Sequence, residues 1–303
     1  MLDICTLGTG GSIPMPDRAL SSLYVRVGGR ALLLDCGEGT QTQIRRLGWG
    51  FLCIEGLLLT HYHGDHVSGL PGFLLSLDKA GRKEPFPIWG PVGLRRIVEG
   101  LMVIAPGLSF PLELHELPVG GGTLSLIGLT IDAFPLDHGI PCLGYRLRLN
   151  RLPRFDPEKA RALNVPMPKW GLLQQGSAVE SDGRTVQPED VSGPARPGLC
   201  VLYATDTRPV PAIAQMGRGA DLMILEGMYG EESKLPQALR NHHMLFSEAA
   251  ALAREAGVPR LLLTHFSNCI EDPELLLDAA RAVFPQTDAA SDLYACTLRF
   301  PGR

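Results

Sequence analysis

A short apolar run leads directly into a cluster of potential metal ligands in Leu57-Leu58-Leu59-Thr60-His61-Tyr62-His63-Gly64-Asp65-His66. A continuous apolar run of this length is typical of a buried strand. The turn that follows carries imidazole and carboxylate groups to the carboxyl end of that strand, which is where open α/β sheets place their sites. The segment therefore predicts an α/β fold with a site at a strand end.

The spacing within this turn predicts two groups of ligands. His61 and His63 are two residues apart, so in extended backbone their side chains point to the same side. Asp65 and His66 are adjacent, so they diverge and can serve a second centre. Borderline metals such as zinc accept imidazole and carboxylate together. We expect two metal ions here; the alternative is a histidine-rich surface loop, which four ligand-type residues in one turn disfavour.

Further potential ligands also stand where apolar runs end. A lone histidine at a strand end is more often a structural residue with its hydrogen bonds satisfied. Three such positions together with the first turn favour a common metal site at one edge of the sheets. His115 and His242 lack this setting, and we expect them to be surface or packing residues. The three positions are His138 after Phe134, Asp206 after Leu202, and His265 after Leu263.

Strand-like and helical patterns alternate along most of the chain, which predicts an α/β domain of packed layers. Ser247 is the expected N-cap of one helix, and Gly257 is expected to end it. The expected strands are 31–34, 56–59, two between 123 and 135 with a turn at Gly128, 199–204, 222–226 and 260–264. The expected helices are 66–79, 93–103, 247–256 and 273–284.

The stretch from about Arg151 to Pro197 breaks this alternation. It is rich in Pro, Gly and charge, and segments of this kind inside compact domains are usually functional or mobile. Between Arg146 and Lys169 lie seven Lys or Arg residues against two acidic ones. We expect one domain over 1–303 with a projecting insertion at about 151–197. The alternative that this stretch is a disordered linker is disfavoured, because potential ligands lie on both sides of it. The alternative that its positive charges only form a solvated surface remains open.

Composition sets further limits. The chain has 303 residues and a formal net charge of −4, which by itself disfavours a nucleic-acid ligand, although the distribution of charge matters more than the total. Seven cysteines without Cys-x-x-Cys spacing suit reduced thiols in a cytoplasm. No apolar stretch is long enough to cross a bilayer, and the N-terminus does not look like a signal peptide. We expect a cytoplasmic protein without membrane association.

Several motifs resemble those of one family. The His-x-His-x-Asp-His turn with the later His, Asp and His resembles the metallo-β-lactamase fold of binuclear zinc hydrolases, and in particular its ribonuclease Z branch. The resemblance extends through almost the whole chain, and the 151–197 stretch resembles the arm that grips tRNA in bacterial members. The other motifs are Leu7-Gly8-Thr9-Gly10-Gly11-Ser12-Ile13-Pro14, Asp35-Cys36-Gly37-Glu38-Gly39-Thr40-Gln41, Gly69-Leu70-Pro71-Gly72 and Thr205-Asp206-Thr207.

This resemblance implies an αββα sandwich and a zinc-dependent endoribonuclease. Its substrate would be precursor tRNA, cut to leave a 3′-hydroxyl on the tRNA and a 5′-phosphate on the trailer. It implies two zinc ions, with manganese or cobalt as alternatives, and a homodimer. Asp65 would orient or deprotonate water, and His243 would contact the phosphate or protonate the leaving oxygen. Metal one would bind to His61, His63, His138 and Asp206. Metal two would bind to Asp65, His66, Asp206 and His265. The arm would bind RNA through Arg154, Lys159 and Arg161.

The chain departs from the family pattern in three places. The usual His-Ser-Thr reads His243-Met244-Leu245, and a Pro-Gly-Pro of the arm reads Pro166-Met167-Pro168, where Met disfavours the positive φ that Gly permits. The usual Arg and Tyr after the last ligand are replaced by Cys269 and Ile270. Glu226, at a strand end, is either an orienting residue or a plain buried acid.

Two other functions remain open from the sequence. The first is another hydrolase of the same fold, such as a small-molecule phosphodiesterase, arylsulfatase or lactonase, because fold and metals do not determine the substrate. The second is a non-enzymatic binding module with a structural metal site. The basic insertion argues against the first, and seven competent ligand positions argue against the second. A β-lactamase is disfavoured by the expected cytoplasmic location.

Overall fold

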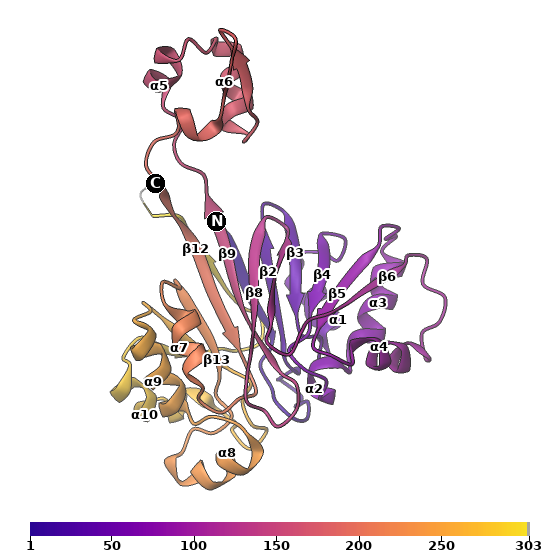
Figure 1. The fold of residues 1–303 in the computed structure, drawn as a ribbon. Coiled ribbons are helices and arrows are strands. Elements are labelled where there is room, and N and C mark those ends of the chain that lie inside the picture. The colour runs from indigo at the N-terminus through magenta and orange to yellow at the C-terminus, as the bar shows by residue number, and fades with distance from the viewer. Residues whose placement is uncertain (302–303) are drawn as a thin grey trace. The chain divides into compact units, whose positions relative to one another are not determined.

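The computed structural model describes residues 1–301, and its larger unit comprises Met1–Leu149 and Leu199–Arg299 (Figure 1). Two seven-stranded mixed sheets form the centre of this unit. They are joined directly where Tyr145 Oη donates to Leu59 O at 2.6 Å and Leu143 N donates to Thr60 O at 2.9 Å. The edge that carries the ligand-rich turn is therefore attached to the opposite sheet.

The first sheet contains the strand that precedes the ligand-rich turn, β4. Its first four strands pair antiparallel, and β3 to β6 pair parallel, so these last strands end at the same edge. The strand order is β16 (Tyr294–Leu298), β1 (Leu2–Gly8), β2 (Ser22–Val27), β3 (Arg30–Leu34), β4 (Ile54–Leu58), β5 (Phe86–Gly90) and β6 (Leu112–Glu116).

The second sheet contributes the other three strand ends. Strands β12 to β15 are parallel, whereas β7, β8 and β9 form an antiparallel meander whose first turn has Gly128 at φ 82°. The strand order is β15 (Thr287–Ala289), β14 (Leu261–Thr264), β13 (Leu222–Glu226), β12 (Arg196–Ala204), β9 (Leu143–Arg151), β8 (Leu129–Pro135) and β7 (Gly122–Leu126).

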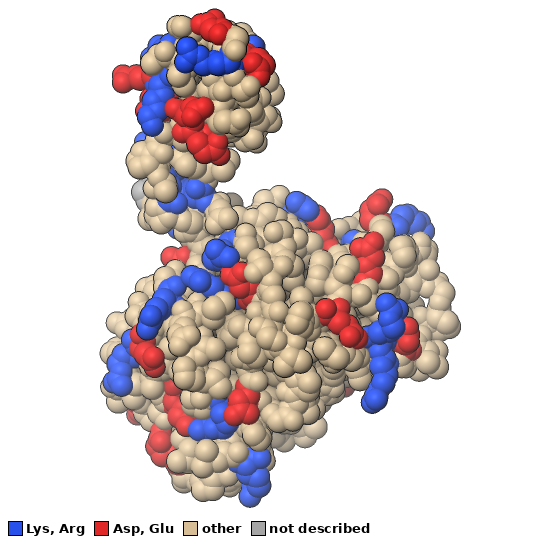
Figure 2. Space-filling model, viewed as in Figure 1, with Lys and Arg blue, Asp and Glu red and all other residues tan. Residues whose placement is uncertain are grey.

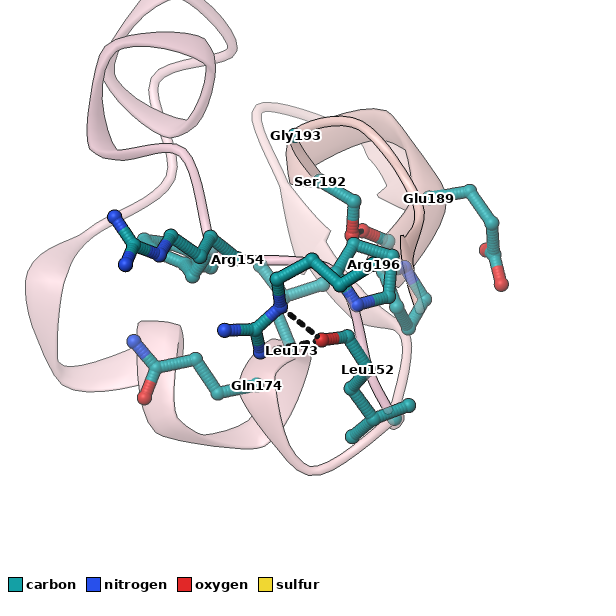
Figure 3. Close-up of a pocket in the computed structure, with 12 residues that line it drawn as sticks. Leu152, Arg154, Leu173, Gln174, Glu189, Ser192, Gly193 and Arg196 are labelled. Atoms are coloured by element: carbon teal, nitrogen blue, oxygen red, sulfur yellow. Dashed lines mark hydrogen bonds between the residues drawn. The ribbon is translucent and has the colours of Figure 1, made fainter. Parts of the chain in front are cut away.

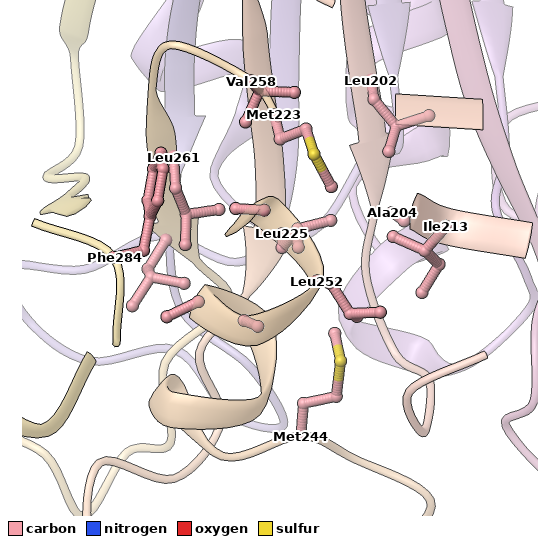
Figure 4. Packing of buried hydrophobic residues seen from close by; sticks show 14 of the residues in the cluster. Leu202, Ala204, Ile213, Met223, Leu225, Met244, Leu252, Val258, Leu261 and Phe284 are labelled. Atoms are coloured by element: carbon pink, nitrogen blue, oxygen red, sulfur yellow. The ribbon is translucent and has the colours of Figure 1, made fainter. Parts of the chain in front are cut away.

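Helices cover the outer face of each sheet and complete the αββα sandwich, so the predicted fold is confirmed (Figure 1). A buried cluster under the second sheet includes Leu202, Leu225, Leu252 and Phe284 (Figure 4). The helices on the second sheet are α7 (Pro211–Gly217), α9 (Phe246–Ala256) and α10 (Asp278–Val283). The helices on the first sheet are α1 (Thr40–Leu47), α3 (Leu70–Lys79) and α4 (Leu94–Met102). The remaining helices of this unit are α2 (Gly64–Val67), η2 (Glu232–Lys234), α8 (Leu235–Asn241) and η3 (Pro273–Leu276).

Three helix boundaries differ from the expected ones. The helix expected over 66–79 is divided into α2 and α3 at Ser68 and Gly69, because Gly69 N leaves the helical pattern and donates to Cys36 O at 2.9 Å. The helix expected over 273–284 is divided into η3 and α10. Ser247 does not cap α9, which begins one residue earlier; Gly257 does end it, with φ 68°.

Residues 150–198, together with Phe300 and Pro301, form a second compact unit, which we call the arm. The arm has a hydrophobic core of its own, built around Ala160, Val165, Leu173 and Val179. The sequence showed little apolar periodicity here because the elements are short. They are α5 (Pro157–Ala162), α6 (Met167–Gln174), β10 (Val179–Ser181), β11 (Arg184–Val186) and η1 (Pro188–Val191).

No helix within residues 1–301 combines the length and the apolar character that crossing a membrane requires.

Candidate metal centre

The seven predicted ligands all follow the carboxyl ends of strands in the larger unit. The ligand-rich turn follows β4, His138 follows β8, Asp206 follows β12 and His265 follows β14. These side chains are buried, with the exception of His63, which is exposed. The structure thus brings together residues that are up to about two hundred positions apart in the chain, as the shared position at strand ends predicted.

Three imidazoles make up the first group. His63 Nδ1 lies 3.1 Å from His61 Nε2 and 3.0 Å from His138 Nε2. Neutral imidazoles offer one lone pair each, and a tight cluster of such nitrogens is the arrangement that borderline metals prefer. His61, His63 and His138 can therefore converge on one cation.

The second group contains two carboxylates and two imidazoles. His66 Nε2 lies 3.2 Å from both His265 Nε2 and Asp206 Oδ2. His265 Nε2 lies 3.3 Å from Asp65 Oδ2 and 3.4 Å from Asp206 Oδ1. Asp206 Oδ1 also lies 3.9 Å from His61 Nε2 and 3.8 Å from His138 Nε2, so Asp206 stands between the two groups.

Two buried polar atoms at this centre have no hydrogen-bond partner within the described residues, and they are Asp206 Oδ2 and His265 Nδ1. A buried carboxylate oxygen without a donor carries a large desolvation penalty, and such atoms call for an explanation such as a bound ion. The donor set of nitrogen and carboxylate oxygen atoms suits zinc, manganese or cobalt. The residues present therefore fit the two cations that the fold family implies.

The outer nitrogens of three of these imidazoles are held by neighbouring groups. Asp35 Oδ2 lies 2.9 Å from His66 Nδ1, and the carbonyl of His242 lies 3.1 Å from His138 Nδ1. Thr60 Oγ1 lies 3.0 Å from His61 Nδ1. Partners of this kind determine the tautomer and leave the other nitrogen free to bind metal.

Asp35 was not predicted to take part in the site, although it is fully buried there. Its Oδ1 accepts hydrogen bonds from Thr60 N at 2.8 Å and Thr60 Oγ1 at 3.0 Å, and its Oδ2 accepts one from Tyr203 Oη at 3.2 Å. A signal was present in the sequence, because Asp35 directly follows the apolar run of β3, as the ligands follow theirs.

The backbone at the centre adopts conformations that are rare for residues other than glycine. Asp35, Asp206 and His265 have φ values of 59°, 54° and 56°. Each such residue costs on the order of 1–3 kcal/mol, and residues of this kind cluster at functional sites. Gly37 allows a close approach as well, since a Cβ there would lie 2.3 Å from Asp65 O.

His243 lies beside the second group and is paired with a buried acid. Its Nδ1 lies 3.0 Å from Glu226 Oε2, which also accepts a hydrogen bond from Met244 N at 3.1 Å, so Glu226 contacts both the ring of His243 and the backbone that follows it. Burial lowers the pKa of His243, but the charge and hydrogen bond of Glu226, together with the charges of Asp206 and Asp65, outweigh burial and raise this pKa to about 9. His243 also comes within ligand distance of Asp206 and His138, so its position alone does not exclude metal binding.

The two acidic members of the centre are held in the ionised form. Burial raises the pKa of Asp206, but the imidazoles of His265, His66 and His61 outweigh burial and hold it well below its usual range. The pKa of Asp65 is also lowered, because its hydrogen bond with His265 and the nearby His66 outweigh burial. Ser12 N donates to Asp65 Oδ2 at 2.6 Å.

The two remaining histidines lie outside the centre. His115 is about half exposed and stacks on Trp89, with ring centroids 5.0 Å apart. The side chain of His242 pairs with Asp137, with Nδ1 and Oδ1 2.9 Å apart. Only the backbone carbonyl of His242 reaches the centre.

Comparison with known proteins identifies the family. Two family models match parts of the chain: the anti-Pycsar protein Apyc1 over residues 2–89, and the β-lactamase superfamily domain over residues 176–266. Ribonuclease Z of Lachnoclostridium phytofermentans is 46% identical over 300 residues, covering 99% of each chain. Ribonuclease Z of Clostridium acetobutylicum is 44% identical over 298 residues, covering 96% of each chain.

Solved structures agree with the fold. The short form of human tRNase Z has a TM-score of 0.70 at 24% identity, covering 98% of this chain and 100% of the other. The metallo-β-lactamase-fold protein YhfI of Bacillus subtilis has a TM-score of 0.69 at 19% identity, covering 97% and 98%. With relatives above 40% identity over nearly its full length, the chain belongs to the ribonuclease Z family of endoribonucleases, within the metallo-β-lactamase fold.

Proposed function

We propose that this enzyme removes the 3′ trailer from precursor tRNA, leaving a 3′-hydroxyl on the tRNA and a 5′-phosphate on the trailer. The observation that carries the proposal is the pair of adjacent ligand groups that share Asp206, in a chain whose relatives are named ribonuclease Z. Two zinc ions are the proposed cofactors, with manganese or cobalt as alternatives that suit the same donors.

The proposed ligands of metal one are His61, His63, His138 and Asp206, and those of metal two are Asp65, His66, Asp206 and His265. Cations held by these residues would supply Lewis-acid chemistry, which activates water at neutral pH and stabilises negative charge on the attacked phosphodiester.

Asp65 and His243 are the proposed catalytic residues. An acid whose pKa is depressed is a weak base, so Asp65 is better suited to orienting the attacking water than to removing its proton. A raised pKa keeps His243 protonated at neutral pH, which suits a group that donates a proton to the leaving 3′ oxygen. Glu226 stabilises this protonated form and holds the ring in place.

The arm is the proposed RNA-binding element, but its charge is distributed differently from the expectation. Over residues 150–198 seven Lys or Arg residues are nearly balanced by six acidic ones, and both kinds are interspersed on the face that Figure 2 shows. Lys159 Nζ donates to Ser192 O at 2.6 Å, and Arg161 lies over the ring of Trp170. The side chains of Lys159 and Arg161 are therefore engaged within the arm, which makes them weaker candidates for RNA contacts than Arg154.

Arg154 belongs to a group of arginines without acidic partners. Arg154 and Arg196 line a cavity of about 740 Å³, and their side chains point into it together with Gln174 (Figure 3). Arg196 donates to Leu152 O at 2.8 Å, while Arg154 has no ion-pair partner in residues 1–301. An unpaired guanidinium at an open cavity suits an RNA phosphate. Arg154 is the residue of the arm that we propose contacts the substrate most directly.

The proposal is tested by incubating the enzyme with precursor tRNA that carries a 3′ trailer and mapping both product ends. A single cut with a 3′-hydroxyl on the tRNA and a 5′-phosphate on the trailer supports it. Cleavage that yields a 3′-phosphate, or no cleavage of tRNA in a preparation that hydrolyses a small phosphodiester, contradicts it.

A small-molecule phosphodiesterase on the same fold is the competing function, and the arm distinguishes the two. Replacing residues 151–197 with a short Gly-Ser loop should leave hydrolysis of a small chromogenic diester intact and strongly weaken precursor tRNA binding. Within the arm, Arg154→Gln should weaken tRNA binding and reduce its salt dependence, because each lost phosphate contact lowers the slope. Arg184→Gln, a change of equal charge elsewhere in the arm, is the matched control. Equal tRNA cleavage with and without the arm would show that the arm is not the RNA-binding element.

We also propose a homodimer, on the basis of the family resemblance. Light scattering coupled to size-exclusion chromatography measures the mass directly, and a monomer of 32.8 kDa would contradict the proposal.

A further inference from the structure

The segment that carries His243 begins helix α9 without a side-chain cap. The residue before the helix is Leu245, which has φ −78° and ψ 156° but no side-chain oxygen to accept the amides of the first turn. Helices normally use Ser, Thr, Asp or Asn at this position, and the loss of such a cap destabilises the start of the helix. The position of the His243 segment must therefore be maintained by other groups.

Glu248 supplies the first of these groups. It occupies the third position of α9 and reaches back to accept a hydrogen bond from Leu245 N at 2.9 Å. This is one of the two hydrogen bonds of a capping box. The other bond, which a hydroxyl at the cap position would accept from the first turn, is missing because Leu245 has no hydroxyl. Glu248 thus fixes the chain two residues after His243.

Arg208 supplies the second. Its guanidinium makes a bidentate ion pair with Glu248, in which Nη1 donates to Oε2 at 2.9 Å and Nη2 donates to Oε1. Nη1 also donates to the backbone carbonyl of His243. The side chains of Arg208 and Glu248 are only 14% and 23% exposed, and partly buried bidentate pairs have a strict geometry.

The backbone of Arg208 connects this pair to the metal centre. Arg208 stands two residues after Asp206, and its amide donates to Asp137 O at 2.9 Å, next to His138. The backbone of Arg208 thus joins the loop that carries Asp206 to the loop that carries His138, and its side chain binds the carbonyl of His243. Glu226 holds the imidazole of His243, and Arg208 is the side chain that ties the backbone carbonyl of His243 to the loops of the centre.

We propose that Arg208, with Glu248, is a positioning residue that holds His243 at the distance from the metal centre that catalysis requires. This inference rests on the proposed role of His243. Arg208 is not a substrate-binding residue in this scheme, because its donors are already directed at Glu248 and the His243 carbonyl. A displacement of about 1 Å in a catalytic group costs on the order of 100-fold in rate.

The central test compares Arg208→Gln in two backgrounds. In the otherwise unchanged enzyme, kcat on precursor tRNA and on a small chromogenic diester should fall on the order of 10- to 100-fold, with KM and metal content unchanged. In a His243→Ala background the same substitution should have no further effect on kcat, since its target is gone. A loss of equal size in both backgrounds would overturn the proposal, because Arg208 would then act on the metal centre or on folding.

Further variants separate positioning from other roles. Glu248→Gln should reproduce the loss in kcat, and Arg208→Glu combined with Glu248→Arg should recover part of it. Arg208→Lys, which keeps the charge but not the bidentate geometry, should lie between Arg208→Gln and the unchanged enzyme. A raised KM for tRNA with normal kcat would instead make Arg208 an RNA-binding residue, and a lowered melting temperature with normal kcat would make it merely structural. Either result would overturn the proposal.

Arg260→Gln is the matched control, because Arg260 forms an ion pair with Asp288 at 2.7 Å away from this segment. It should leave kcat unchanged. If His243→Ala by itself leaves kcat unchanged, the proposed catalytic role of His243 is wrong; if His243→Ala lowers kcat and Arg208→Gln does not, only the present inference is wrong.

Discussion

Substitution of the buried acid behind His66 tests how the metal centre is organised. In Asp35→Asn the side chain keeps its shape, and the amide oxygen can still accept from Thr60 N. The amide NH₂ then faces His66 Nδ1, where Asp35 Oδ2 now lies at 2.9 Å. A donor at this position stabilises the tautomer of His66 that carries its proton on Nε2, so the nitrogen that faces Asp206 and His265 loses its lone pair. We expect metal binding at the second group to weaken.

The size of the effect follows from the role of such partners in other metal sites, where their loss costs about 10- to 100-fold in affinity, or roughly 1.4–2.7 kcal/mol. Titrating metal-free protein with zinc against a chromophoric chelator measures both affinities. The first group should change less, because Asp35 contacts none of its imidazoles directly.

Asp292→Asn provides the matched control for general destabilisation. Asp292 is a half-buried carboxylate that accepts Thr9 N at 3.0 Å and Ala19 N at 2.7 Å and touches none of the seven ligands. The Asp292→Asn substitution should lower the melting temperature while leaving zinc affinity unchanged. Unchanged zinc affinity in Asp35→Asn, or an equal loss in Asp292→Asn, would refute the argument from the tautomer.

Three further predictions concern single residues. Elemental analysis of protein purified without chelator should find close to two metals per chain, and His66→Ala should empty the second group more than the first; activity that survives strong chelators would contradict this. His243→Ala should reduce turnover on tRNA and on a small diester without loss of metal, and metal loss would show that His243 is a ligand. Met167 begins helix α6 and is not among the residues with positive φ, so the expected need for glycine at this position is not met by the structure; because its side chain is 70% exposed, Met167→Gly should leave tRNA binding, measured by filter binding, unchanged.

The sequence by itself determined the fold class and where the seven candidate ligands stand. Apolar runs that end in His or Asp are visible without any structure, because strand burial and strand ends are local properties of the chain. The same holds for Gly128 at a hairpin and Gly257 after a helix, since both act through their own backbone angles. For these features local chemistry and tertiary structure agree.

Only the tertiary structure showed which groups hold the ligands in place. Asp35 meets His66 across 31 residues, and Arg208 meets Glu248 across 40, at spacings that no periodic pattern encodes. Ser247 had the chemistry of a helix cap, yet α9 begins earlier, where Glu248, held by Arg208, accepts the amide of Leu245. Long-range hydrogen bonds of this kind depend on where the sheets bring distant loops together, and that is a property of packing.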